Sequence, residues 1–138
     1  MSAADVLTAS VRIAAPPESV FPFLVDSALI VEWIGEWAKL EPEPGGTFAL
    51  DFPGTAVRGE YVAIEPPHRV VFTWGVPGHE TMPTGSTTVE IQLSADGSGT
   101  LVELFHRDLP ADEFDRHLEG WTEMLGKLAT NRGWPLPS

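Results

Sequence analysis

The segment GEYVAIEPPHRVVFTWG, residues 59–75, decides the fold class of this chain. Apolar and polar side chains alternate on each side of its central proline pair, which is the pattern of two strands joined by a tight turn. Val62 and Ile64 share one face of the first strand, and Glu60 is in register with them. We therefore expect these three side chains to point toward the core, where a carboxylate must be neutralised or paired.

The same period of two continues over residues 36–107, interrupted by proline and glycine turns. It predicts about six antiparallel strands with one apolar face, to which Phe48, Phe72 and Trp74 contribute. The β-branched segment at residues 6–13 predicts one further strand at the start of the chain. Residues 75–86 contain too many helix and strand breakers for regular structure, so we expect a loop there.

Helical signals lie before and after this region. Residues 17–27 and 28–35 predict two short helices, with Ser27 as the N-cap of the second. Residues 111–131 carry a stripe of large apolar residues at spacings of four and three, which predicts one long helix. The stripe consists of Phe114, Leu118, Trp121, Leu125 and Leu128.

These elements can bury their apolar faces together only if the sheet curls around the long helix. The sequence therefore predicts an α+β fold: a curved antiparallel sheet of six or seven strands wrapped around a C-terminal helix, with two short helices after the first strand. The large aromatic side chains on both layers would hold them apart, so we expect a cavity between the sheet and the helix.

Length and composition restrict the function classes. A chain of 138 residues suits one domain spanning residues 1–138. Its formal net charge of −12 disfavours nucleic acid and anionic membrane surfaces as partners. Because it has no cysteine, thiol chemistry is excluded. Its first residues lack the pattern of a secretory signal, so we expect a cytoplasmic location.

Five segments in order resemble the family of the activator of heat-shock protein 90 ATPase, in its bacterial form. They are VRIAAPPESVFPFLVDS (11–27), PGGTFALDFPG (44–54), GEYVAIEPPHRVVFTWG (59–75), DGSGTLVELFHRDLP (96–110) and HLEGWTEMLGKLA (117–129). The resemblance implies a single START-like, or SRPBCC, domain with the helix-grip fold, in which a hydrophobic cavity lies between a curved sheet and a long C-terminal helix.

Within that fold, the family pattern implies that Val102, Leu104 and His106 face inward. His106 is then either a buried structural histidine or, beside Glu60, one half of an acid/base pair. Glu60 is either that partner or an acid at the rim of the sheet that reaches water. The aromatic residues would form the apolar wall. The expected cavity lining consists of Trp33, Trp37, Phe48, Glu60, Phe72, Trp74, His106, Phe114, Leu118 and Trp121.

Three functional hypotheses remain open at this point. The first is binding of a small hydrophobic or amphipathic molecule without established catalysis. The second is a cyclase-like or hydrolase-like enzyme that uses Glu60 and His106. The third is a co-chaperone-like module with a protein partner or a homodimeric state. We expect no metal and no cofactor, because His79 and Glu80 lack a third ligand nearby. For His117, one turn before Trp121, we expect packing or an edge hydrogen bond.

Overall fold

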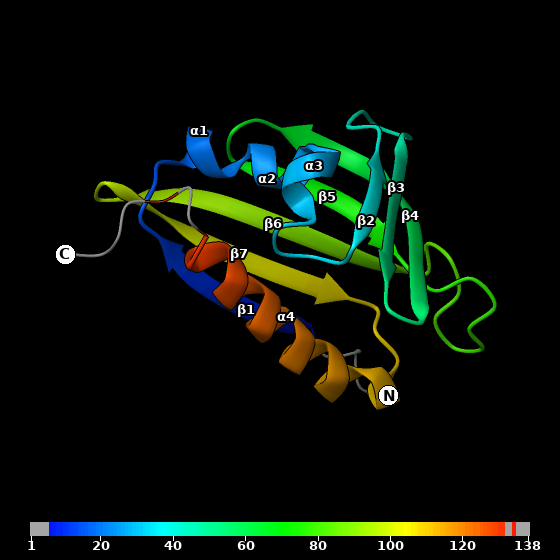
Figure 1. The fold of residues 1–138 in the computed structure, drawn as a ribbon. Helices are drawn as coiled ribbons and strands as arrows, with labels where there is room; N and C mark the ends of the chain where they lie inside the picture. Colours follow the sequence, from blue (N-terminus) through cyan, green and yellow to red (C-terminus); the bar gives the residue numbers. More distant parts are fainter. Residues whose placement is uncertain (1–5, 132–133, 135–138) are drawn as a thin grey trace.

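The computed structural model describes residues 6–131 and 134, and these residues form one seven-stranded antiparallel sheet. The strand order is β1-β7-β6-β5-β4-β3-β2, so β1 and β2 are the two edges (Figure 1). The predicted sheet and its predicted curvature around a helix are confirmed. The strands are β1 (Leu7–Ile13), β2 (Trp37–Leu40), β3 (Thr47–Phe52), β4 (Thr55–Glu65), β5 (Arg69–Trp74), β6 (Thr87–Asp96) and β7 (Gly99–Arg107).

Three one-turn helices follow β1, where the sequence predicted two helices. They are α1 (Pro17–Val20), α2 (Pro22–Val25) and α3 (Ser27–Ile30). The first predicted helix divides because Pro22 has no backbone N–H and therefore begins a new helix. The predicted cap is also displaced by one residue: the Asp26 carboxylate, not Ser27, accepts hydrogen bonds from the N–H groups of residues 28 and 29 at 2.8 and 3.1 Å.

The long C-terminal helix α4 (Phe114–Ala129) follows the short 3-10 helix η1 (Ala111–Glu113). It lies against β1, and its Trp121 side chain reaches His106 of β7, on the same side of the sheet as the short helices (Figure 1). None of the helices in the described part of the chain has the length and hydrophobicity needed to cross a membrane. Because it lies on this side of the sheet, α4 forms the second layer, which covers the apolar face of the sheet.

The buried stripe of α4 differs from the predicted one at a single position. Trp121, Leu125 and Leu128 are buried as expected, and Phe114 is half-buried. Leu118, however, is 37% exposed, so its predicted place in the cavity is wrong. It lies three residues before Trp121, which places it about 60° around the helix axis and at the margin of the stripe.

The face prediction for β4 is also wrong at its centre. Tyr61 is buried, and its hydroxyl donates a hydrogen bond to the carbonyl of Leu24 at 3.0 Å, whereas Val62 is 51% exposed. Glu60 is exposed, on the opposite face from Tyr61. The pairing of β4 with β5 shifts register between Tyr61 and Ala63, so the inward-facing set moves by one residue at this bulge.

The outer face of the sheet carries one buried carboxylate, that of Glu90 on β6. Its oxygens accept hydrogen bonds from the side chains of Arg69 at 2.6 Å, Arg107 at 2.9 Å and Gln92 at 3.0 Å. Burial alone would raise the pKa of Glu90, but these hydrogen bonds outweigh it and lower the pKa to about 2. Arg69, Glu90 and Arg107 join three neighbouring strands, which makes the network a structural feature of the sheet.

Candidate functional site

A pocket of about 340 Å³ lies between the first half of α4, the β3–β4 hairpin and the loop formed by residues 75–86. Most of its wall is apolar, and its polar side chains come mainly from the loop and the start of α4. The apolar residues are Phe52, Val57, Trp74, Val76, Met82, Trp121 and Met124. The remaining lining residues are Thr55, His79, Glu113, Arg116, His117 and Gly120.

Hydrogen bonds between backbone groups hold the 75–86 loop in place. The N–H of Val76 donates to the carbonyl of Met82 at 2.8 Å, which closes the loop at its base. Gly75 is required there, because a Cβ atom at this position would overlap the carbonyl of Pro83. The loop is therefore an ordered part of the pocket wall.

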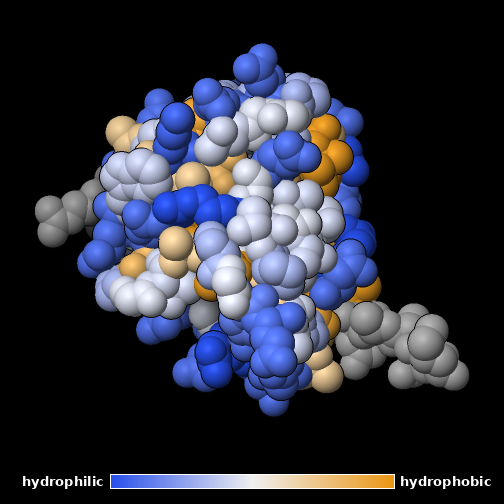
Figure 2. Space-filling view, turned by 90° about the vertical axis from the view of Figure 1, so that its right-hand side faces the viewer, coloured by the Kyte–Doolittle hydropathy of each residue, from blue (hydrophilic) through white to orange (hydrophobic). Residues whose placement is uncertain are grey.

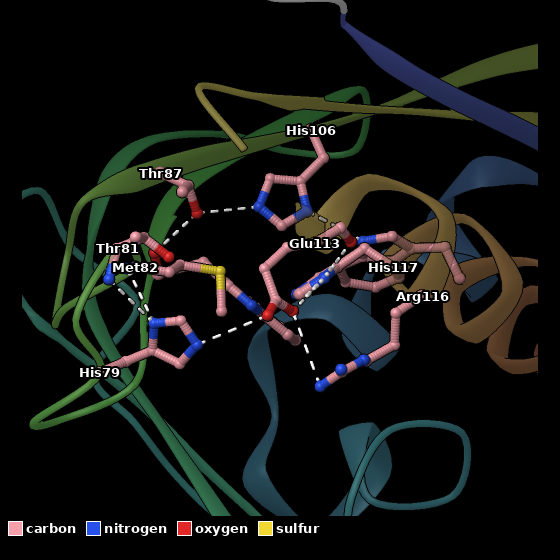
Figure 3. A network of polar contacts seen from close by, with 10 residues as sticks. His79, Thr81, Met82, Thr87, His106, Glu113, Arg116 and His117 are labelled. Atoms are coloured by element: carbon pink, nitrogen blue, oxygen red, sulfur yellow. Dashed lines mark hydrogen bonds and ion pairs between the residues drawn. The ribbon is translucent and has the colours of Figure 1, made fainter. Parts of the chain in front are cut away.

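His79 is oriented by its own loop. Its Nδ1 atom accepts hydrogen bonds from the N–H groups of Met82 at 2.9 Å and Thr81 at 3.2 Å. An atom that accepts two N–H groups carries no proton, so the proton of the neutral ring is on Nε2. Nε2 lies 3.4 Å from Oε2 of Glu113, and the imidazole therefore presents its N–H side to this carboxylate (Figure 3).

Glu113 is the buried carboxylate of the pocket, with only 5% of its surface exposed. Three nitrogen atoms surround it loosely: Nε2 of His79 at 3.4 Å, Nδ1 of His117 at 3.6 Å and Nη1 of Arg116 at 3.9 Å (Figure 3). None of the described residues donates a hydrogen bond to its carboxylate oxygens. This carboxylate is thus removed from water with few hydrogen bonds in return.

His117 lies one turn after Glu113 and lines the same pocket. Its Nδ1 atom donates to the main-chain carbonyl of Glu113 at 2.9 Å, which leaves Nε2 as the unprotonated acceptor of the ring. Burial lowers the pKa of His117, so the ring is neutral at pH 7. Within the described residues Nε2 has no hydrogen-bond partner, and it is the second open acceptor of the site.

His106 differs from His117 because both of its ring nitrogens are bonded. Nδ1 accepts from the indole N–H of Trp121 at 3.0 Å, and Nε2 donates to the hydroxyl of Thr87 at 2.8 Å. That hydroxyl in turn donates to the carbonyl of Trp74 at 2.6 Å. Burial, and to a smaller extent the neighbouring His117, lowers the pKa of His106 to about 3, so the ring stays neutral. Of the two predicted roles, the geometry is that of the structural histidine.

The predicted pair of Glu60 and His106 is not formed. His106 is on β7 and faces the core, whereas Glu60 is on β4 and faces solvent. Strands β5 and β6 lie between them, a separation of about 14 Å at the spacing of neighbouring strands. The bulge in β4 turns Tyr61 inward, and this is why the alternating pattern predicted the wrong face for Glu60.

The aromatic residues predicted to line the cavity separate into three groups. Trp74 and Trp121 line the pocket, with ring centroids 5.0 Å apart. Phe48 and Phe72 stack at 3.8 Å in the core instead. Trp33 is buried, and its indole N–H donates to the carbonyl of Phe23. Phe114 is half-buried. Trp37 is exposed, as is Leu118, the aliphatic residue of the predicted lining.

The prediction for Trp37 is therefore wrong, and its physical cause is visible. Trp37 begins the edge strand β2, which has one neighbour and is short, so its outward side is not covered. Its ring lies on the guanidinium of Arg58, with 5.6 Å between the ring centroid and Cζ. This cation–π contact accommodates an indole outside the core.

The sequence contained one signal for the missed polar residues. Glu113, His117 and Trp121 are spaced four residues apart, and this spacing places side chains on one face of a helix. A carboxylate and an imidazole in line with a buried tryptophan indicate a polar group at the edge of the apolar stripe. His79, in contrast, comes from an irregular loop, so its approach to Glu113 depends on tertiary structure.

The described residues contain no group of three His, Cys, Asp or Glu side chains that could hold a metal ion. The face that includes the right-hand side of Figure 1 is covered mainly by hydrophilic and intermediate residues (Figure 2). Hydrophobic residues appear on this face in small separate areas. The apolar side chains of the site are therefore gathered inside the pocket and not on this outer surface.

The sequence and the fold match those of a known protein family. The model of the family described as Activator of Hsp90 ATPase homolog 1-like protein matches residues 14–131. The chain belongs to this family. Its curved sheet and long C-terminal helix are those of the START-like, or SRPBCC, helix-grip fold, as the sequence resemblance implied. A search of curated proteins found no match.

Solved structures include further members of this family and its fold. The AHSA1-like protein RHE_CH02687 from Rhizobium etli is 35% identical, with a TM-score of 0.71, over 97% of this chain and 92% of that one. CalU16 from Micromonospora echinospora is 30% identical, with a TM-score of 0.78, over 96% and 77%. DynU16, a protein in the dynemicin biosynthetic locus, has a TM-score of 0.81 at 23% identity, and this chain spans 49% of its length.

Proposed function

We propose that this protein binds a small hydrophobic or amphipathic molecule in the pocket between the sheet and α4, without established catalysis. The observation that carries the proposal is the pocket itself, with a volume of about 340 Å³ and a largely apolar wall. This volume is at the lower end of the range of small-molecule sites. It suits a compact ligand better than a lipid with two acyl chains.

The side chains of the pocket support an amphipathic ligand. The tilted rings of Trp74 and Trp121 offer an apolar surface to a flat or aliphatic body. Glu113 and His117 offer acceptors at one end of the same pocket. The indole N–H of Trp74 is buried and has no hydrogen-bond partner in the described part of the chain, so a ligand atom or a water molecule could accept from it.

A pair of glycines in α4 provides the test. Gly120 lines the pocket, and a Cβ atom there would meet only the end of the Met124 side chain, at 4.0 Å. Gly126 lies in the same helix with open space around it. Gly120→Leu should fill the pocket, whereas Gly126→Leu adds the same side chain outside it and serves as the control.

The measurement is binding of Nile red, a neutral dye whose emission reports an apolar environment, together with native mass spectrometry of the purified protein. We expect dye binding, or a retained small molecule, in wild type and Gly126→Leu, and its loss in Gly120→Leu. Equal binding by all three proteins would contradict the proposal. So would the absence of both dye binding and a retained molecule from the wild-type protein.

The second candidate function is association with another protein, which the family description suggests. Trp37 favours it, because an exposed indole on the edge strand β2 could be covered by a second copy of the chain. Sedimentation velocity tests this candidate. A dimer that Trp37→Ser dissociates would support it, and a monomeric wild-type protein at micromolar concentration would contradict the homodimer.

A further inference from the structure

The polar end of the pocket presents two acceptor groups, the carboxylate of Glu113 and the imidazole of His117. The two carboxylate oxygens of Glu113 and Nε2 of His117 receive no hydrogen bond from the described residues. The nearest nitrogens to the Glu113 oxygens are at 3.4 to 3.9 Å, beyond well-formed hydrogen bonds. A ligand head that completes this end of the site must therefore donate hydrogen bonds.

The charge of Glu113 is compensated only weakly by its neighbours. Burial lowers the pKa of His117, and Nδ1 of His79 accepts two backbone N–H groups, so neither imidazole is a permanent cation. Arg116 is the permanent cation among the described lining residues. Its side chain is 79% exposed and 3.9 Å from the carboxylate, so water screens much of this interaction. A buried negative charge therefore remains available to a cation.

Two further features favour a positively charged head over a negatively charged one. The protein has a formal net charge of −12, which attracts cations to its surface and repels anions. The indole faces of Trp74 and Trp121 line the same pocket, and tryptophan rings attract cations as well as apolar groups. Neither feature would assist a carboxylate or phosphate.

We propose that the pocket selects an organic amine: an ammonium head bound by Glu113 and His117, and a compact apolar body packed on Trp74 and Trp121. This inference rests on the proposed function, because it specifies the ligand of the same pocket. An ammonium group has three donors, which match the open acceptors of the carboxylate and the imidazole. Charge-assisted hydrogen bonds to a buried carboxylate are stronger than neutral ones, which gives the selectivity its physical basis.

Three probes with the same apolar body test the inference. They are naphthylmethylamine, naphthylmethanol and naphthoate, titrated into wild type, Glu113→Gln and Glu119→Gln by isothermal titration calorimetry at pH 7. Glu119 is exposed on α4, so its variant loses the same charge outside the pocket. Gly120→Leu is included to show that binding occurs in the pocket.

We expect the amine to bind wild type about tenfold more tightly than the alcohol, and the carboxylate to bind more weakly than both. Glu113→Gln should lower the affinity for the amine by about ten- to hundredfold and change that for the alcohol by less than about threefold. Glu119→Gln should match wild type within about threefold. Glu113→Asp, which keeps the charge, should retain the preference for the amine and serves if Glu113→Gln does not fold.

The outcomes separate the two proposals. If the alcohol or the carboxylate binds as tightly as the amine, and Gly120→Leu abolishes that binding, the pocket is a ligand site and the amine inference is wrong. An amine affinity that Glu113→Gln leaves unchanged has the same meaning. If none of the three probes binds wild type, the amine inference fails, and the dye and mass-spectrometry test decides the proposed function separately.

Discussion

Glu90 and Glu113 are equally hidden from solvent, at 7% and 5% exposure, yet their surroundings differ in kind. Glu90 accepts three side-chain hydrogen bonds of 2.6 to 3.0 Å. Glu113 has three nitrogens at 3.4 to 3.9 Å and accepts no side-chain hydrogen bond from the described residues. The first carboxylate makes its hydrogen bonds within the protein, and the second lines the pocket with its oxygens free of hydrogen bonds from the described residues.

His106 and His117 differ in their hydrogen bonding in the same way as the two carboxylates. His106 is bonded through both ring nitrogens, whereas His117 is bonded through Nδ1 alone. Their rings are 5.3 Å apart, but His106 is fully buried and His117 is only partly buried and lines the pocket. Hydrogen bonding and burial therefore both separate the histidine that stabilises this fold from the one available to a ligand.

The largest expected effect comes from removing the side chain that saturates His106. Trp121→Ala deletes a fully buried indole and the donor to Nδ1, so we expect a loss of about 3 to 5 kcal/mol in the free energy of unfolding. Trp37→Ala is the matched control, because Trp37 is exposed, and should change the stability by less than about 1 kcal/mol. Urea denaturation measures both, and similar midpoints for the two variants would contradict the assignment of Trp121 to the core.

The second-largest effect is expected from acidification, which should lower the stability of the folded protein because His106 is buried in its neutral form. The pKa of His106 is about 3 in the folded protein, against 6.5 for an unperturbed imidazole. Between these values the unfolded chain binds a proton that the folded protein does not, so stability is fully present above pH 6.5 and decreases as pH falls. The expected slope is about 1.4 kcal/mol per pH unit. His117, whose pKa is also lowered, adds to the loss in the same direction.

Urea midpoints at pH 7, 6 and 5 measure this slope above the range in which Glu90 protonates. His106→Gln should be less stable than wild type at pH 7 but show a smaller pH dependence. A wild-type midpoint that does not change between pH 7 and pH 5 would contradict the assignment of His106 as a neutral, buried group.

The third-largest effect on stability is expected at Glu90, the carboxylate that accepts three side-chain hydrogen bonds. Glu90→Gln leaves Arg69 and Arg107 without their common acceptor, and breaking a buried ion pair is costly. Because these arginine side chains are 36% and 42% exposed, they can be rehydrated, and we expect a loss of about 1 to 3 kcal/mol. Glu60→Gln, on the exposed face of β4, should remain within about 0.5 kcal/mol of wild type in the same urea assay.

The same residues also show which parts of the fold could be predicted from the sequence. The sheet and α4 follow from periodicities of two and 3.6 residues. The inward face of Val102, Leu104 and His106 was implied by the family resemblance and not by the periodicity, and these three residues are buried. The prediction for Glu60 was wrong because one bulge in β4 shifts the register, and no periodic pattern marks that bulge. Local sequence therefore specified the elements better than it specified their irregularities.

The site was predicted only in part, for a related reason. Trp74 and Trp121 are on regular elements and line the pocket as expected. His79 reaches Glu113 from the 75–86 loop, and its orientation depends on hydrogen bonds from Thr81 and Met82 within that loop. Such interactions arise when a loop is placed against a helix in three dimensions, so neither residue spacing nor hydrophobicity could indicate them.

Glu113→Gln should have the smallest effect on stability, and this result tests the difference between the two carboxylates most directly. The amide keeps the shape of the side chain and removes a desolvated charge. The energy gained by removing that charge should equal or exceed its weak attraction to the nitrogens of His79, Arg116 and His117. We expect the variant to be between equal to wild type and about 1 kcal/mol more stable, with Glu119→Gln on the exposed side of α4 as the control. Thermal and urea denaturation at pH 7 measure the difference.

A destabilisation of more than about 2 kcal/mol would mean that Glu113 is held as firmly as Glu90, and the distinction between a saturated and an open carboxylate would then be lost. A neutral or stabilising result would mean that Glu113, whose oxygens accept no hydrogen bond from the described residues, carries a charge that the fold itself does not need.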